Sequence, residues 1–278
     1  MTASPFHPPT HHERPRPRLA LALSGGAARC IAQLGVLQVF EEEGIAVDAI
    51  AGTSGGSLIG ALYLDGRMSV GELVTLAAKT GWTDVFKPAI PTTGLISSEG
   101  IHRFISSHLH ARYIGNLDKP FAAVCADMIT GDKVVLTSGS LALAVQASCS
   151  LPIIFTPTEV GGRALIDGGY VSQIPVLAAR EELGARHVVA VDVNHKAGAE
   201  DPRLTSLPRV AMHLAQLLGR RNADAELPHA DAAIKVDITG IQLYDIGKHK
   251  ELVRRGREAA IEKLPEIKAL LSGTCSGS

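Results

Sequence analysis

The sequence predicts an α/β fold, a three-layer α/β/α sandwich built on a mainly parallel sheet. Short apolar runs alternate along the chain with segments of helical periodicity, and glycine-rich turns connect the two. Strands that alternate with helices form parallel sheets covered on both faces. The 278 residues, 46% hydrophobic and 20% charged, are enough to bury a sizeable core. We therefore expect one domain over residues 19–272, followed by a flexible tail at 273–278.

The first 18 residues contain five prolines and almost no aliphatic side chains. They cannot bury enough apolar surface to offset their ordering entropy, so we expect residues 1–18 to form a disordered tail. Arg14, Arg16 and Arg18 precede the apolar run LALAL, an order that also occurs at the start of a signal peptide. Because this run ends after five residues at a Ser-Gly-Gly turn, a buried first strand is the better interpretation.

The remaining elements follow from periodicity and turn residues. Ile31, Leu34 and Leu37 form one helical stripe, and Gly44 ends that helix. Strands are expected at 19–23, 48–51, 121–127, 133–137, 164–166 and 188–193. Helices are expected at 28–43, 57–64, 70–80, 99–110, 141–148, 176–183, 207–218 and 248–271. Residues 82–98 contain prolines and glycine without a period, and we expect 82–112 to cover an apolar cleft as a lid.

Composition disfavours several classes of function. A formal net charge of -1, from 27 basic and 28 acidic residues, gives no field that would attract nucleic acid. No stretch approaches the roughly 20 apolar residues of a membrane span, so membrane contact is expected to be peripheral and transient. The four cysteines show no C-x-x-C spacing and are interpreted as reduced thiols in the cytoplasm. Basic residues at 248–257 alternate with glutamates, as on a solvated helix face.

Residues 52–56, GTSGG, fit the G-x-S-x-G pattern of a nucleophile elbow. In such an elbow a crowded strand-to-helix turn raises the serine above the sheet, so positions two before and two after it must lack bulk. The helix that follows points its N-terminus at the developing anion. A predicted strand and a predicted helix flank this pentapeptide, which makes Ser54 the candidate nucleophile, although the pattern also occurs by chance.

Residues 24–29, SGGAAR, form a second small-residue turn between a buried strand and a helix. Exposed backbone amides in such a turn can hold an anion or form an oxyanion hole. A dinucleotide-binding loop, with Asp48 holding a ribose, is an alternative, but G-x-G-x-x-G is not present in register. A plain tight turn is the other alternative.

Residues 165–169, LIDGG, place Asp167 at the end of an apolar strand. Carboxylates at the carboxyl ends of parallel strands converge on the crevice where open α/β sheets bind ligands. A lone D-G-G is more often a turn. Asp127 and Asp192 also end strands, and we interpret both as structural.

Together, and in this order, the three motifs resemble those of the patatin-like phospholipase family. The resemblance runs from residue 19 to 193 and includes the connecting segments 126–131 and 147–152. It implies a patatin-type fold and a hydrolase of carboxylic esters, such as lipid acyl esters, that needs no metal or organic cofactor. By position, it makes Ser54 the nucleophile and Asp167 the base that accepts its proton.

The resemblance also implies an oxyanion hole from the amides of Gly25, Gly26 and Ala27. Arg29 would fix the loop through backbone carbonyls or, as the less favoured alternative, meet a substrate phosphate. Further supporting residues are Gly52, Gly55, Gly56, Gly168 and Gly169. The chain departs from the family pattern at Cys30, where glycine is usual, and at Gln173, where asparagine is usual.

Two alternatives remain open. A non-catalytic nucleotide- or acyl-binding module would keep a degenerate elbow, and Cys30 is its main support because a positive φ there would distort the loop. A Ser-His-Asp triad would use His195 or His213, but neither lies in a glycine-rich loop like that of Asp167. With a dyad, we expect the pH profile to lack an essential group near the histidine value of roughly 6.5.

Overall fold

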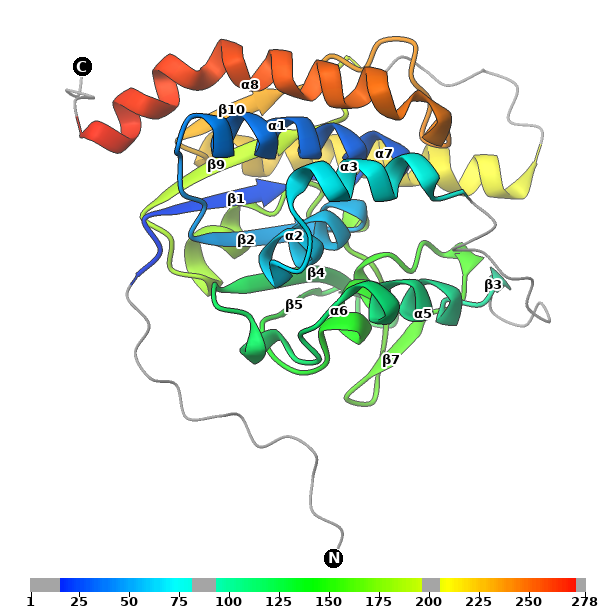
Figure 1. Ribbon diagram of the computed structural model, residues 1–278. Coiled ribbons are helices and arrows are strands. Elements are labelled where there is room, and N and C mark those ends of the chain that lie inside the picture. Colours follow the sequence, from blue (N-terminus) through cyan, green and yellow to red (C-terminus); the bar gives the residue numbers. More distant parts are fainter. Residues whose placement is uncertain (1–15, 82–93, 197–205, 274–278) are drawn as a thin grey trace, which may run out of the picture.

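In the computed structural model, the described residues 16–81, 94–196 and 206–273 form a mixed sheet between two layers of helices (Figure 1). The strands are β1 (Leu19–Leu23), β2 (Ala49–Thr53), β3 (Gly94–Ile96), β4 (Phe121–Asp127), β5 (Lys133–Leu136), β6 (Ile153–Phe155), β7 (Thr158–Val160), β8 (Arg163–Asp167), β9 (His187–Asp192) and β10 (Ala232–Lys235). All six predicted strands are present, whereas β3, β6, β7 and β10 were not predicted.

The main sheet of the described residues has the strand order β10-β9-β1-β2-β4-β8-β7, with β5 also paired to β4. Its first five strands are mutually parallel. β5 and β8 run antiparallel to β4, and β7 runs antiparallel to β8. The prediction of a mainly parallel sheet is confirmed, and the antiparallel edge is a feature that the sequence did not indicate. β3 and β6 form a separate parallel pair.

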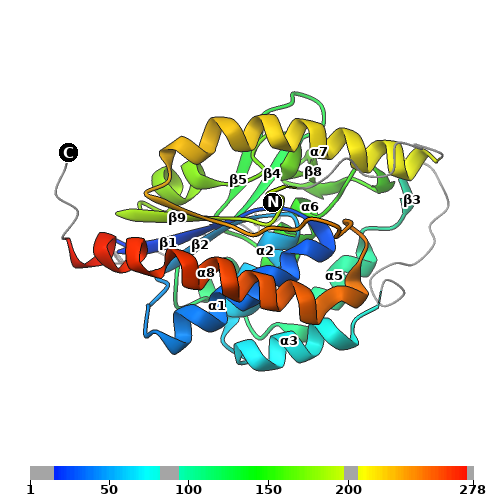
Figure 2. The same ribbon diagram turned by 90° about the horizontal axis from the view of Figure 1, so that it is seen from above.

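Helices cover both faces of the sheet, as the three-layer prediction requires. They are α1 (Ile31–Glu42), α2 (Gly55–Asp65), α3 (Val70–Lys79), α5 (Glu99–His108), α6 (Leu141–Ser148), α7 (Leu207–Glu226) and α8 (His249–Ser272). α1, α3 and α8 lie on one face, and α7 lies on the other (Figure 2). The predicted helix at 176–183 is a short π-helical segment, η4 (Ala178–Glu182), and α7 runs to Glu226 rather than ending at Leu218.

Local sequence explains where several helices begin and end. α3 starts at a capping box, in which the Ser69 hydroxyl accepts from the Glu72 amide and the Glu72 carboxylate accepts from the Ser69 amide. α1 begins after a 3₁₀ turn, η1 (Ala27–Cys30), and the chain leaves it through Gly44, whose φ of +64° suits glycine.

The central strand β1 divides its side chains between the two layers. Leu19, Leu21 and Leu23 join the large core under α1, α2 and α8, while Ala20 and Ala22 face the thinner layer that contains η4. The large side chains of β1 therefore all point into one core, and its small side chains all point into the other. Hydrophobic burial of both faces explains why this run contains no polar residue.

α1 and α8 cross in direct backbone contact at two glycines. A Cβ on Gly35 would lie 2.1 Å from the Val253 carbonyl oxygen, and one on Gly256 would lie 1.9 Å from that of Ala32. No other residue fits at either position without moving one helix. This crossing fixes α8 against the helix that follows the first glycine-rich turn.

The expected tails and lid are only partly described. Residues 1–15, 82–93, 197–205 and 274–278 lie outside the described residues, and they include the first part of the expected lid. The expected N-terminal tail reaches too far, because Pro17 and Arg18 accept backbone hydrogen bonds from Arg186 and His187 at 2.9 and 3.0 Å. Within the described residues, no helix combines the length and apolar character that crossing a bilayer requires.

Candidate active site

Ser54 occupies a strained turn between β2 and α2. Its φ of 53° and ψ of −128° are a conformation that residues with side chains rarely adopt. A Cβ on Gly52 would lie 2.5 Å from the Ser57 backbone, and one on Gly56 would lie 2.4 Å from the Leu23 carbonyl oxygen. Both flanking positions therefore require glycine, as a nucleophile elbow does.

Neighbouring hydroxyls hold this elbow in place. The Ser54 amide donates to Ser148 Oγ at 2.9 Å, and that hydroxyl donates to the Val124 carbonyl at 2.6 Å. Ser57 Oγ donates to the Ser54 carbonyl at 2.7 Å. Ser148 is thus a supporting residue that sequence reasoning did not single out, although it lies in the segment 147–152 that carries the family resemblance.

Strand register brings Asp167 level with Ser54. Thr53 of β2 pairs with Val124 of β4, and the next residue of β4, Cys125, pairs with Asp167 of β8. Only β4 separates the two side chains in the sheet. The register therefore places Ser54 and Asp167 at neighbouring positions, but not through parallel strands as expected, because β8 runs antiparallel to β4 and enters the site from the opposite direction.

The Asp167 carboxyl is buried, with 6% of the residue exposed. Burial raises its pKa to about 6, while hydrogen bonds with the Ser54 side chain and the Gly169 amide lower the pKa. The Gly169 amide lies 2.8 Å from Asp167 Oδ1, and Gly168 approaches β4 so closely that a Cβ would lie 2.2 Å from the Val124 oxygen. A carboxyl with a pKa of about 6 titrates close to the histidine value of roughly 6.5, so the expected pH profile needs histidine variants beside it to identify the group.

The second glycine-rich turn, residues 24–29, lies beside Ser54 and is called the oxyanion loop below. A Cβ on Gly25 would lie 3.2 Å from the Ser54 Cβ. The Gly25 amide donates to the Gln173 carbonyl at 3.0 Å, so it is not available to an oxyanion and its expected role needs correction. Within the described residues, the amides of Gly26 and Ala27 have no such partner. Ala27 has a φ of 46°, in the left-handed region.

Two side-chain amides fix the Gly25 carbonyl. Gln173 Nε2 donates to it at 2.9 Å and Asn194 Nδ2 at 2.8 Å. Gln173, a departure from the family pattern, therefore has a defined role. Asn194 was missed by sequence reasoning, and its only signal is its place just beyond the carboxyl end of β9.

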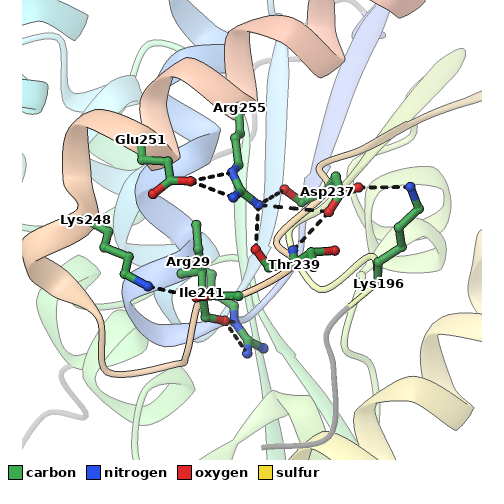
Figure 3. A network of polar contacts seen from close by, with 9 residues as sticks. Arg29, Lys196, Asp237, Thr239, Ile241, Lys248, Glu251 and Arg255 are labelled. Atoms are coloured by element: carbon green, nitrogen blue, oxygen red, sulfur yellow. Dashed lines mark hydrogen bonds and ion pairs between the residues drawn. The ribbon is translucent and has the colours of Figure 1, made fainter.

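Arg29 anchors the back of the oxyanion loop. Its side chain is 1% exposed and donates from Nε and Nη2 to the Ile241 carbonyl at 3.1 and 2.8 Å (Figure 3). The loop that contains Ile241 is held in turn by α8, because Arg255 donates to the carbonyls of Asp237 and Thr239 at 2.8 and 3.0 Å. The structural role expected for Arg29 is the one the contacts support.

Cys30 does not distort the oxyanion loop. Its φ of −60° and ψ of −19° are helical, so the position does not require glycine. The Cys30 sulfur fits because Gly55 lacks a side chain, since a Cβ there would lie 2.7 Å from Sγ. Burial raises the pKa of the thiols of Cys30, Cys125 and Cys149, so all three are protonated at neutral pH.

The other acids and the histidines have different surroundings. Asp127 forms an ion pair with Arg163 at 2.7 Å and caps the turn amides of Ile129 and Thr130. Only Ser54 and Gly169 contribute hydrogen bonds that shift the Asp167 pKa, and no described histidine contributes. Burial raises the pKa of Asp192, and the neighbouring Asn194 amide and His195 partly oppose this shift, so His195 lies near Asp192.

A pocket of about 290 Å³ is lined in part by Gln173 and Asn194, the two residues that hold the Gly25 carbonyl. Its charged and ionisable lining residues are Asp192, His195, Lys196, Arg220 and Asp224. A lining of mixed charge does not match the apolar cleft expected for an acyl chain.

Comparison with known proteins places this geometry in a family. The family model described as patatin-like phospholipase matches residues 21–180, more than half of the chain. This chain belongs to the patatin-like phospholipase family. The match includes the oxyanion loop, the elbow and the D-G-G turn.

Curated relatives of the patatin-like phospholipase family are longer proteins. The chain is 36% identical over 187 residues to patatin-like phospholipase domain-containing protein 7 of Mus musculus, covering 64% of this chain and 14% of that protein. It is 33% identical over 181 residues to an uncharacterized NTE family protein of Mycobacterium bovis, covering 64% and 49%. The chain therefore spans less than half the length of either relative.

Solved structures share the fold. Human GIVD cytosolic phospholipase A2 has a TM-score of 0.56 at 13% identity, covering 93% of this chain and 59% of that one. VipD from Legionella pneumophila has a TM-score of 0.51 at 14% identity, covering 93% and 67%. At this identity, the likeness shows a patatin-like fold and nothing finer.

Asn194 offers a test of how the patatin-like oxyanion loop is positioned. We expect Asn194→Ala to lower kcat roughly 10- to 100-fold with little change in KM. The Gly25 carbonyl would lose one of its two side-chain donors, so the Gly26 amide that follows it would no longer be held in position. Steady-state kinetics with a soluble ester measures this split. Asn116→Ala, at an exposed position, is the control and should leave kcat unchanged. Equal loss in both variants would contradict the positioning role.

Proposed function

We propose that this protein is a serine hydrolase of lipid acyl esters that acts through an acyl-enzyme, with Ser54 as nucleophile and Asp167 as base. One observation carries the proposal: Ser54, in a strained elbow, lies beside the buried Asp167, and its side chain is one of the groups that shift the pKa of that carboxyl. Membership of the patatin-like phospholipase family supports a lipid acyl ester as the substrate class.

In the acylation half-reaction, Ser54 Oγ attacks the ester carbonyl carbon and Asp167 accepts the hydroxyl proton. The carbonyl oxygen becomes an oxyanion, which the amides of Gly26 and Ala27 and the N-terminus of α2 stabilise. Collapse of this intermediate breaks the bond to the leaving oxygen. Asp167 returns the proton to that oxygen, so the alcohol leaves and an acyl ester of Ser54 remains.

Deacylation repeats the same steps with water as the nucleophile. Water attacks the acyl carbon, Asp167 accepts a proton, and the same amides hold the second oxyanion. The bond to Ser54 Oγ then breaks, the proton returns to that oxygen, and a carboxylic acid leaves. No step needs a metal or an organic cofactor, because both proton transfers use Asp167.

The pKa of Asp167 makes this chemistry more accessible. A carboxyl at its ordinary value of roughly 3.9 is a weak base for a hydroxyl. Burial raises the Asp167 pKa to about 6, which brings its basicity closer to the working pH while the group stays ionised at pH 7 and above.

A fluorophosphonate probe tests the proposal directly. Human GIVD cytosolic phospholipase A2, a fold neighbour, was solved with a fluorophosphonate inhibitor. We expect the probe to label this protein once, at Ser54, as mapped by mass spectrometry. Ser54→Ala should abolish labelling, whereas Ser107→Ala, at an exposed serine, should not affect it.

Two results would contradict the proposal. A folded protein with no labelled serine would favour the non-catalytic binding module. Labelling at another serine would show that Ser54 is not the nucleophile. Release of free fatty acid from phospholipid, lysophospholipid and glyceride substrates then identifies the acyl donor.

A further inference from the structure

The outer side of α7 exposes a row of leucines. Leu207, Leu214, Leu217 and Leu218 are 59, 49, 46 and 42% exposed. Their spacing places them on one side of a helix with 3.6 residues per turn. We call this set the leucine face. The opposite side of α7 is buried at Gly219, Ala223 and Glu226.

Single exposed leucines are ordinary, but several on adjacent helical turns form a contiguous apolar surface. Such a surface costs free energy in water and marks a site of interaction.

Basic side chains share the exposed surface of α7 with the leucine face. Arg209, Arg220 and Arg221 are exposed on α7, and Asp224 is the exposed acidic residue of the same helix. An apolar stripe with a local excess of arginine is the composition of a helix that lies in the interface of an anionic membrane. The charge pattern therefore favours an anionic lipid surface as the occupant.

The inner side of α7 touches the candidate active site. Asn222 Nδ2 donates to the Tyr170 carbonyl at 2.7 Å, in the turn that follows Asp167. Gly219 packs against Gln173, which holds the oxyanion loop, and a Cβ there would lie 2.8 Å from Gln173 Oε1. A membrane bound to the leucine face would therefore lie one helix away from both halves of the site.

We propose that the leucine face of α7 docks the protein on anionic lipid bilayers. The leucines enter the boundary between headgroups and acyl chains, and the arginines contact lipid phosphates. This inference rests on the proposed function only for the source of its substrate, because docking itself needs no catalysis. The competing occupant is a second copy of this chain, which would cover the leucines in a dimer.

Vesicle co-sedimentation with the full chain tests the docking surface. Ser54→Ala serves as the background, so that hydrolysis does not change the vesicles and failure of the catalytic proposal leaves the result interpretable. We expect binding to vesicles of phosphatidylcholine with phosphatidylglycerol, and weaker binding to phosphatidylcholine alone. Leu214→Gln with Leu217→Gln should lower the affinity on the order of tenfold or more.

A matched control separates the leucine face from general surface polarity. Ile261 is 52% exposed on α8, on the other face of the sheet, and Ile261→Gln should leave vesicle affinity unchanged. Arg209→Gln with Arg221→Gln should weaken binding roughly fivefold for each charge removed. Added salt should reduce the difference in vesicle affinity between this double variant and its background protein.

Three results would overturn the inference. The double leucine variant could bind vesicles as tightly as its background. The arginine variant could bind anionic and neutral vesicles alike with undiminished affinity. Alternatively, light scattering could show a dimer that the leucine variant converts to monomer, with no vesicle binding in either form, which would assign the face to a second copy.

Discussion

Replacing Asp167 with asparagine should reduce turnover of a soluble ester roughly 10³-fold or more, because Ser54 loses the group that accepts its proton. Asparagine keeps the shape of the side chain and can still accept from the Gly169 amide. The loss therefore reports proton transfer rather than packing. His195→Gln and His213→Gln should each cost at most a few-fold. If either histidine variant were folded and as inactive as Ser54→Ala, the result would contradict the dyad and favour a Ser-His-Asp triad.

The pH dependence follows from the same carboxyl. Asp167 must be ionised to act as a base, so kcat/KM should rise with pH through about 6 and level off above it. The pH profile alone cannot distinguish this carboxyl from a histidine. The identity of the group comes from combining the profile with the histidine variants, in which the rise should persist.

Asp167→Asn should also make the folded protein more stable above pH 6. The folded-state pKa of about 6 lies above the ordinary value, so ionisation favours the unfolded chain and stability falls as pH rises from about 4 to 6. Removing this charge should raise the free energy of unfolding by up to about 3 kcal/mol at pH 8. Thermal denaturation should show the gain shrinking as pH falls toward 4. A variant that is both inactive and less stable at pH 8 would contradict this account.

The second large effect is expected where α1 crosses α8. Gly256→Ala should lower the free energy of unfolding by about 2–3 kcal/mol, because the new Cβ would lie 1.9 Å from the Ala32 carbonyl oxygen and would push the two helices apart. In a chain of this size, that corresponds to a fall in Tm of roughly 5–10 °C. Differential scanning calorimetry measures it.

Gly71→Ala is the matched control for this prediction. Gly71 also lies inside a helix, α3, and a Cβ there would meet nothing within 4 Å. Helix propensity alone should therefore make Gly71→Ala stabilising by about 0.5–1 kcal/mol. Opposite signs for the two variants are the expected result. If both were stabilising, the close helix crossing would not exist in solution.

Much of the fold could be predicted because its signals are local. The run LALAL, the helix stripe beginning at Ile31 and the glycines around Ser54 each report burial or backbone geometry within a few residues. Strand β10, with the sequence AAIK, was missed because four residues without a glycine boundary resemble many loops. The antiparallel direction of β8 was missed because it depends on a long connection from β4 rather than on the strand itself.

The sequence predicted which residues form the candidate site, but not their hydrogen-bond partners or the pKa of Asp167. Ser54 and Asp167 carry motif signals, whereas Asn194 acts through a carbonyl 169 positions away in the sequence. Loss of the Gly25 amide to Gln173 is likewise a contact between distant segments. The raised pKa of Asp167 results from burial, a property of the assembled sheet that no motif contains.

The supports of the oxyanion loop extend well beyond the region that defines the family. Asn194, Ile241 and Leu243 all lie after residue 180, where the family match ends, and each bonds directly to residues 25–29. The residues matched by the family model therefore include the proposed reacting groups but not all of the residues that hold the oxyanion loop in place. A protein engineered to contain this site would need the segment through α8. A transferred segment that ended at residue 180 would contain Ser54 but would lack the residues that position the amides of the oxyanion loop.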